Sequence, residues 1–104
     1  MNKHFNFIAN RMNELGFSKF NMKSLRVNIE SGQQIERFNA HNEFLYLVNE
    51  SIPGDLIIHS DSNLFFSSAP QSGSFIPQEF SGLICIESSS VDPFQLEFIR
   101  VIPA

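Results

Sequence analysis

The residues best suited to metal binding or acid–base chemistry are the three histidines, at positions 4, 41 and 59. Their spacing forms no HxH, HxxxH or HExxH pattern, which would bring two imidazole groups to one metal ion. His59 and Asp61 share a face if their strand continues, but one imidazole and one carboxylate are too few ligands for a closed site. We interpret this pair as the solvent-facing end of a strand, and we predict no metal and no cofactor.

Nucleophilic catalysis has equally little support. Cys85 is the single cysteine, and it lies in an apolar stretch where a thiol is expected to pack as a small hydrophobic group. A single cysteine also excludes an intrachain disulfide. The serines fall in turn-like segments without a GxSxG motif.

Paired carboxylates are the remaining source of acid–base chemistry. Glu43 and Glu50, or Glu87 and Glu97, could face each other across a sheet by chance, as in any domain with 11 acidic residues. The five glycines are scattered and form no phosphate-binding loop. We therefore predict that the protein is not an enzyme.

Composition indicates one ordered domain. The chain has 104 residues, of which 42% are hydrophobic and 17% charged, and a chain of this length supports one core. Its 12 phenylalanines, with one tyrosine and no tryptophan, exceed what so small a core is expected to enclose completely. The surplus suggests an apolar surface that meets a partner subunit, and the alternative is that several rings are half-buried.

The charge distribution narrows the choice of partners. The net charge is −4, and four of the seven cations lie in the first 23 residues, so the rest of the chain is acidic and we predict no nucleic-acid binding. Apolar runs are far shorter than the about 20 residues that span a bilayer. We expect no transmembrane segment, and a soluble protein that is cytoplasmic at synthesis.

The first secondary-structure element expected in the chain is a helix. Phe5, Ile8, Met12 and Leu15 recur at spacings of three and four, which places them on one stripe, and Gly16 is placed to end the helix in a left-handed cap. We assign residues 1–21 to this amphipathic helix and its connector. A short helix needs a surface to dock on, either its own sheet or a neighbouring subunit or assembly protein that binds this stripe.

Residues 22–104 are predicted to form a mainly antiparallel β-sandwich of about seven strands. A jelly-roll-like arrangement is the first choice and an immunoglobulin-like sandwich the second. An irregularity such as a bulge is expected near Phe38. The expected strands are residues 24–29, a segment around 35–38, and residues 43–50, 56–59, 63–66, 80–87 and 94–101.

The stretch from Ser67 to Gln78 is rich in serine and proline, and we interpret it as a surface loop. Loops of this kind carry recognition in β scaffolds, and the rings that could serve are Phe65 and Phe66, just before the loop, and Phe75 within it. A carbohydrate- or peptide-binding module using residues 67–78 is therefore the alternative function. The absence of tryptophan makes a small-molecule ligand the weaker choice.

One resemblance bears on function. The run from Leu25 to Gln34, with Ser31-Gly32-Gln33 at its turn, is followed by Phe38-Asn39-Ala40 and by the aromatic strand Phe44 to Val48. This pattern resembles small virion proteins of bacterial viruses, capsid-associated or spike-type, over about residues 22–103. The resemblance implies a structural component of the virion that works by self-assembly, as a homo-oligomer, and it carries no catalytic residues.

Overall fold

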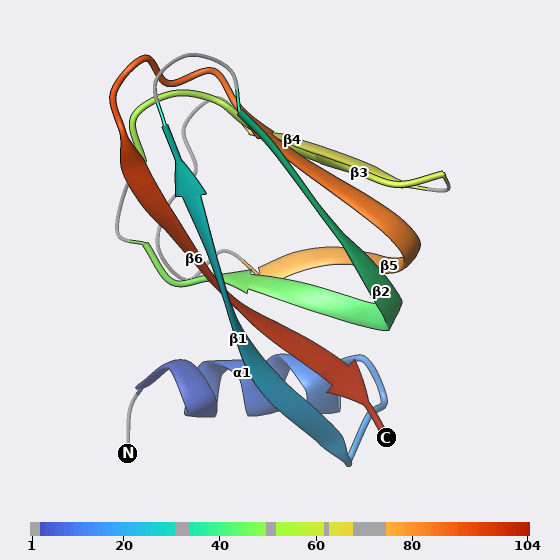
Figure 1. Cartoon of the computed structure of the whole chain (residues 1–104). Helices are drawn as coiled ribbons and strands as arrows, with labels where there is room; N and C mark the ends of the chain where they lie inside the picture. Colours follow the sequence, from blue (N-terminus) through green and yellow to red (C-terminus); the bar gives the residue numbers. More distant parts are fainter. Residues whose placement is uncertain (1–2, 31–33, 50–51, 62, 68–74) are drawn as a thin grey trace.

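The computed structural model describes residues 3–30, 34–49, 52–61, 63–67 and 75–104. It contains one helix followed by six strands (Figure 1). The elements are α1 (Lys3–Glu14), β1 (Phe20–Ile29), β2 (Gln34–Leu47), β3 (Leu56–His59), β4 (Leu64–Ser67), β5 (Phe75–Ser88) and β6 (Phe94–Pro103).

All six strands belong to one antiparallel sheet with the order β1-β6-β2-β5-β3-β4. The predicted fold class, mainly antiparallel β with one short N-terminal helix, is confirmed. β1 pairs with β6 along its whole length, from Phe20 opposite Pro103 to Ile29 opposite Phe94. The first strand therefore begins at Phe20, and the connector after the helix is shorter than expected.

The sheet folds over on itself because its two longest strands bend in the middle. β2 and β5 have 14 residues each, and their register shifts between Ala40 and Glu43 and again between Glu43 and Leu45. Asn42 has a φ of 52°, which is a left-handed conformation that asparagine tolerates better than most residues. The irregularity expected near Phe38 lies further along the strand, as a bulge between Ala40 and Leu45 that turns β2.

This bend explains why the structure has six strands where the sequence suggested about seven. The segment around Phe38 and the segment from Glu43 are the two halves of β2. Figure 1 shows the N-terminal half of β2 running beside β5 from the top of the molecule down to the bend, and its C-terminal half turning back toward β6. The two layers that a sandwich requires are therefore parts of one bent sheet.

The main core fills the space between the two layers of the bent sheet. Its largest fully buried side chains include Phe80 and Phe98, and Leu25, Phe38, Ile52, Phe65 and Phe94 are partly buried against it. The core residues are Val27, Ile29, Ala40, Leu45, Leu47, Leu56, Ile58, Ile76, Phe80, Ile84, Ile86, Leu96 and Phe98.

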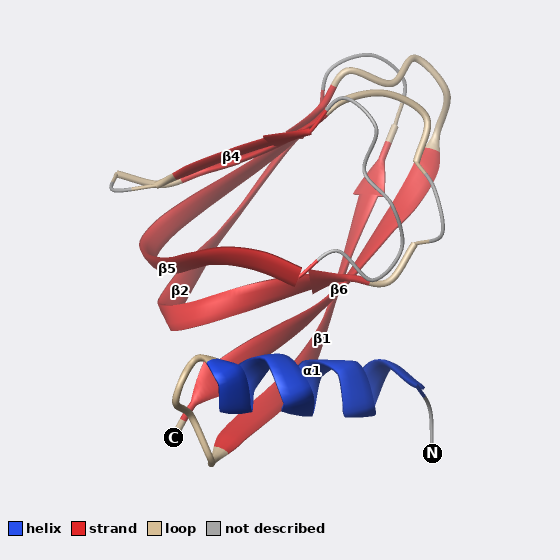
Figure 2. Cartoon of the chain, turned by 180° about the vertical axis from the view of Figure 1, so that it is seen from behind, coloured by secondary structure: helices blue, strands red, loops and turns tan. Residues whose placement is uncertain are grey.

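A second apolar cluster lies between α1 and the outer side of the sheet. Ile8 and Met12 of the helix are fully buried there against Phe44, Tyr46 and Val101. Figure 2 shows α1 lying along one end of the molecule, across the end of β1 and β6. Of the two docking surfaces considered for the helix, its own sheet is the one that the structure shows.

The helix ends where the sequence predicted. Gly16 has a φ of +94°, and the N–H groups of Gly16 and Phe17 donate to the carbonyl groups of Asn13 and Met12 at 3.0 and 2.8 Å. These two bonds satisfy carbonyl groups of the last turn, as in a left-handed helix cap. The chain then turns directly into β1.

The interpretation of residues 67–78 as a surface loop needs correction at its C-terminal end. Residues 75–78 belong to β5, and Ile76 is buried in the main core, which is why this end of the segment is extended. Ser67 closes β4. The remaining part of the predicted loop, residues 68–74, lies outside the described residues.

Candidate functional site

The histidines are held apart by the fold. His4 on α1 is hydrogen-bonded through Nδ1 to the hydroxyl group of Tyr46 at 2.7 Å, and His59 on β3 is bonded through Nε2 to Oε2 of Glu87 at 3.0 Å. His41 is exposed at the bulge of β2. Among the described residues, no group of three or more His, Cys, Asp or Glu side chains is arranged to hold a metal ion.

Three of the four glutamates considered as acid–base pairs have a basic partner. Within the described part of the chain, Glu43 is held by Arg100, Glu97 lies 3.4 Å from Arg26, and Glu87 is bonded to His59. The suggested partner of Glu43, Glu50, lies outside the described residues. Glu87 and Glu97 each have a basic partner instead of facing one another as acid and base.

The expectation that Cys85 packs in the core is wrong. Its neighbours on β5, Ile84 and Ile86, are fully buried, so alternation turns Leu83 and Cys85 to the outer face of the sheet. Cys85 is half-buried there, and Leu83 is 49% exposed. The sequence did not reveal this because both alternating sets of residues in this strand are apolar.

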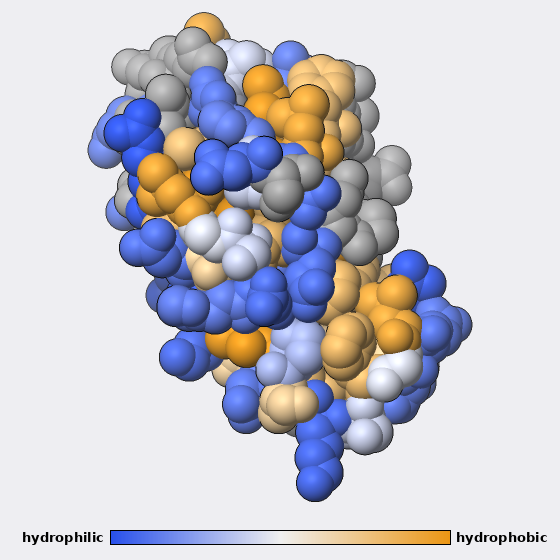
Figure 3. Space-filling view, turned by 90° about the vertical axis from the view of Figure 1, so that its right-hand side faces the viewer, coloured by the Kyte–Doolittle hydropathy of each residue, from blue (hydrophilic) through white to orange (hydrophobic). Residues whose placement is uncertain are grey.

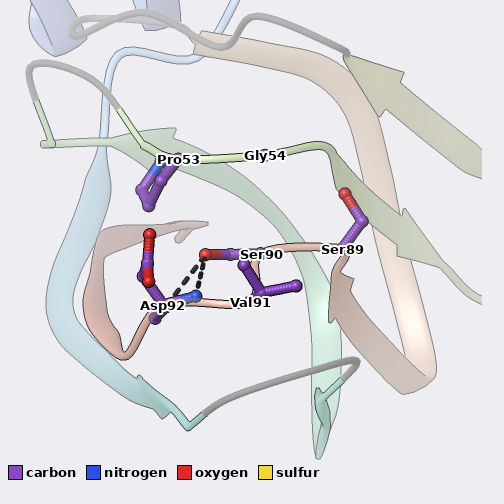
Figure 4. A pocket seen from close by; sticks show the side chains of 6 residues that line it. All are labelled: Pro53, Gly54, Ser89, Ser90, Val91 and Asp92. Carbon is purple, nitrogen blue, oxygen red and sulfur yellow. Dashed lines mark hydrogen bonds between the residues drawn. The ribbon is translucent and has the colours of Figure 1, made fainter.

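One concave site lies between two turns (Figure 4). It has a volume of about 270 Å³ and is lined by Pro53, Gly54 and the Ser89–Asp92 turn. Ser90 Oγ donates to the carbonyl oxygen of Asp92 at 2.9 Å and accepts from the N–H of Asp92 at 3.1 Å. Both hydrogen bonds of the Ser90 hydroxyl group therefore stay within its own turn. We interpret the concave site as the place where the two turns pack together.

The four residues of the helix stripe have different environments. Ile8 and Met12 are fully buried within the chain, and Phe5 is half-buried. Leu15, at the end of the stripe, is 42% exposed. Ile8 and Met12 are therefore committed to the protein's own sheet, while Leu15 is accessible to a partner.

The three rings near the predicted loop are also separated. Phe75 packs in the cluster beneath α1, where its ring centroid lies 5.5 Å from that of Phe44 and 5.9 Å from the guanidinium carbon of Arg11. Phe65 is partly buried against the main core. Only Phe66 points away, with 56% of its surface exposed.

Phe66 belongs to a larger apolar surface on the β3–β4 hairpin. Because Ile58 and Phe65 pack on the core, the alternate residues of both strands lie on the opposite, outer face. Leu64 is 62% exposed on that face. The set of outward residues, called here the hairpin face, is Ile57, His59, Leu64, Phe66, Leu83, Cys85 and Glu87.

The pairing register places a polar pair within this apolar surface. His59 lies opposite Leu64 on β4 and opposite Cys85 on β5, and Ile57 lies opposite Phe66 and Glu87. The His59–Glu87 hydrogen bond therefore runs between neighbouring strands inside the hairpin face. The sequence patterns did not identify Ile57, Leu64 and Leu83 as partner-binding candidates. The alternation of Leu64, Phe65 and Phe66 indicated part of this surface, because it places Leu64 and Phe66 on the same face.

The hairpin extends away from the rest of the sheet. Figure 1 shows β3 and β4 projecting to one side, beside the bend of β5. Figure 3 views the molecule from this side and shows apolar side chains in several patches separated by polar surface. The β4 strand itself, Leu64–Ser67, has no charged residue, whereas β1 at the other edge of the sheet carries Lys23 and Arg26.

The comparisons with other proteins add no relative. The chain matches no protein-family model, and no curated protein and no solved structure shows significant similarity to it. In the described part of the chain, no helix has the length and apolar character needed to cross a membrane.

Proposed function

We propose that this protein is a non-catalytic structural component that self-associates through the hairpin face. The observation that carries the proposal is the exposure of Leu64 and Phe66, 62% and 56%, side by side on one face of a projecting hairpin. Exposed apolar side chains grouped in this way are typical of protein–protein contact surfaces.

The charges favour a second copy of the chain as the partner. The whole protein carries a net charge of −4, so two copies repel each other over most of their surfaces. On the hairpin face the only full charge at neutral pH is Glu87, and Arg37 lies next to it, opposite Cys85 on the neighbouring strand β2. The centre of this face is therefore mainly apolar, so two copies can meet there with less repulsion than over the rest of their surfaces.

The size of the apolar surface sets the expected strength. A stable interface buries about 800 Å² on each partner, whereas a large aromatic side chain contributes about 150–250 Å² when fully buried. Leu64, Phe66 and Leu83 are each about half exposed and supply less than half of the required area. The interface must therefore also include the polar residues next to these three side chains, and we expect a weak, concentration-dependent oligomer.

A virion of a bacterial virus is the setting that we propose for this assembly. Its support is the sequence resemblance of residues 22–103 to small virion proteins. A weak contact between identical subunits becomes effective when a symmetric assembly repeats it many times. Neighbouring genes for other virion proteins would support this setting, and a genomic context of unrelated metabolic genes would oppose it.

The decisive experiment measures solution mass by sedimentation over a range of micromolar concentrations. Phe66→Ser and Leu64→Ser should shift the protein toward the monomer. Val91→Ser is the matched control, because Val91 is 73% exposed on the turn before β6 and is not one of the residues of the hairpin face. A wild-type protein that stays monomeric at high micromolar concentration, or equal effects of the three variants, would refute self-association through this face.

A further inference from the structure

We propose that the hairpin face of one copy binds the exposed flank of α1 on a second copy, so that the copies associate head to tail. This inference rests on the proposed function, because it names the surface that covers the same hairpin face. The helix flank consists of Lys3, Phe7, Arg11 and Leu15, which recur every four residues and therefore lie along one side of the helix.

The helix flank exposes apolar side chains between cations. Phe7 is 43% exposed and Leu15 is 42% exposed, and the N–H group of Leu15 donates to the carbonyl group of Arg11 at 3.0 Å, which continues the helical hydrogen bonding. Lys3 is exposed, and the side chain of Arg11 is 41% exposed. The flank therefore offers apolar contact and positive charge together.

The two surfaces lie in different parts of the molecule. Figure 1 shows α1 at the bottom and the β3–β4 hairpin projecting from the upper part. One copy can therefore use both surfaces at once, each with a different neighbour.

The chain separates its charges between these two parts. The first 23 residues hold four cations, including all three lysines, and one acid, whereas the rest of the chain holds three cations and ten acids. That acid, Glu14, is bonded to Arg11 at 2.8 Å. The exposed residues Lys3, Lys19 and Lys23 therefore give the helix end a net positive charge.

The hairpin face has an acidic rim around its apolar centre. Asp61 lies at the tip of the hairpin, and Glu79 lies beside it, where its carbonyl group accepts a hydrogen bond from Nδ2 of Asn63 at 2.6 Å. Both acids are exposed, and neither forms a salt bridge within the described part of the chain. Glu87 adds a third negative charge, and the neighbouring Arg37 offsets one of the three.

These charges decide between the two surfaces that a second copy can present. Two hairpin faces would bring their acidic rims together, whereas the helix flank brings cations to the acids and Phe7 and Leu15 to the apolar centre. A contact between two different surfaces closes into a ring or continues as a filament. The assembly should therefore grow beyond a dimer as the concentration rises.

The decisive test mixes two variants that each lack one surface. Phe66→Ser keeps the helix flank and Phe7→Glu keeps the hairpin face, so each should sediment as a monomer at a concentration where the wild type is mostly associated. Their equimolar mixture should form a dimer and stop there, because only one intact pair of surfaces remains. Asn13→Glu is the matched control: it adds the same charge to an exposed position on another side of α1, and it should associate as the wild type does.

Circular dichroism checks that the variants keep the fold, and Leu15→Glu replaces Phe7→Glu if the latter unfolds. Asp61→Asn combined with Glu79→Gln tests the acidic rim. This double variant should associate about fivefold more weakly, which is the scale of losing a few exposed ion pairs. If two hairpin faces were in contact, it would associate more tightly instead, because it removes like charges.

Three results would overturn the inference: wild-type association of Phe7→Glu alone, a mixture that stays monomeric, or tighter association of the double variant at the acidic rim. Each of these leaves the proposed function standing if the wild type associates and Phe66→Ser does not. A wild type that stays monomeric at high micromolar concentration would overturn the proposed function, and this inference with it.

Discussion

Arg100 on β6 forms a two-pronged ion pair with the fully buried carboxylate of Glu43 on β2. Its Nε atom bonds to Oε1, and Nη2 donates to Oε2 at 2.8 Å and to the carbonyl oxygen of Asn39 at 3.2 Å. The guanidinium group lies 4.8 Å from the centroid of the Phe38 ring. Glu43 sits at the register shifts of β2, so this pair joins β6 to the bend of the sheet, and the bond to Glu43 raises the pKa of Arg100.

Loss of this pair should destabilise the fold strongly. Glu43→Ala leaves a mostly buried cation without its partner, and we expect the free energy of unfolding to fall by about 3 kcal/mol. Urea unfolding followed by circular dichroism measures the change. Arg26→Ala is the control, because the Arg26–Glu97 pair is largely exposed and contributes at most about 1 kcal/mol. Equal losses in the two variants would contradict a structural role of the buried pair.

Tyr46 should titrate at unusually high pH. Burial raises the pKa of its hydroxyl group above the ordinary value of 10.0, because the ionised form is poorly solvated in the cluster under α1. It is the single tyrosine in a chain without tryptophan, so the ultraviolet absorbance of phenolate reports this residue alone. The midpoint in the native protein should exceed that in urea, and coinciding midpoints would disprove the prediction.

The raised pKa of Tyr46 also fixes the sign of a stability change. As the pH rises above about 10, the unfolded chain loses its tyrosine proton first, which favours unfolding. The free energy of unfolding should therefore fall in this range, and Tyr46→Phe should reduce the slope. The phenylalanine variant also lacks the hydrogen bond to His4, so the slopes against pH are compared and not the absolute stabilities.

Docking of the helix should contribute substantially to stability. Met12→Ala removes a fully buried side chain from the cluster with Phe44 and Val101, and we expect a loss of about 2–5 kcal/mol. Leu15→Ala, on the same helix but 42% exposed, should cost less than about 1 kcal/mol. Thermal and urea unfolding measure both variants, and a Met12 variant as stable as the Leu15 variant would show that the helix is dispensable to the sheet.

Gly54 should resist substitution more than Gly16. Both have positive φ angles, +116° and +94°, but a Cβ atom at Gly54 would lie 2.9 Å from the backbone nitrogen of Ser90, whereas one at Gly16 would meet nothing within 4 Å. Gly16→Ala should cost about 1 kcal/mol, from backbone strain alone. Gly54→Ala adds a clash between the two turns of the concave site, and equal losses in unfolding measurements would refute this close approach.

The sequence determined the local structure well. The period of Ile8, Met12 and Leu15 predicted the helix, and Gly16 predicted its end, because helix periodicity and capping depend on residues a few positions apart. The alternation of Leu25, Val27 and Ile29 predicted β1 for the same reason. The expected number of strands differed by one because a bulge within β2 looks, in sequence, like a break between two strands.

Part of the candidate site was also predictable. Phe66 was proposed as a partner-binding residue, and it is exposed on the hairpin face. Phe65 and Phe75 were proposed with it, yet both pack inward. Adjacent positions on a strand point to opposite faces, so Phe65 and Phe66 could not both be outward, but the pattern did not say which of the two was.

The tertiary structure decided the features that depend on contacts between residues far apart in the sequence. From Leu83 to Ile86 the residues on both faces of the strand are apolar. Which of the two faces turns inward then depends on the layer of the sheet that packs against the strand. Arg100 finds Glu43 across a separation of 57 residues, and Glu87 finds His59 across 28, through strand pairings that no local pattern specifies. The hairpin face exists only once these strands lie side by side, because it results from long-range packing.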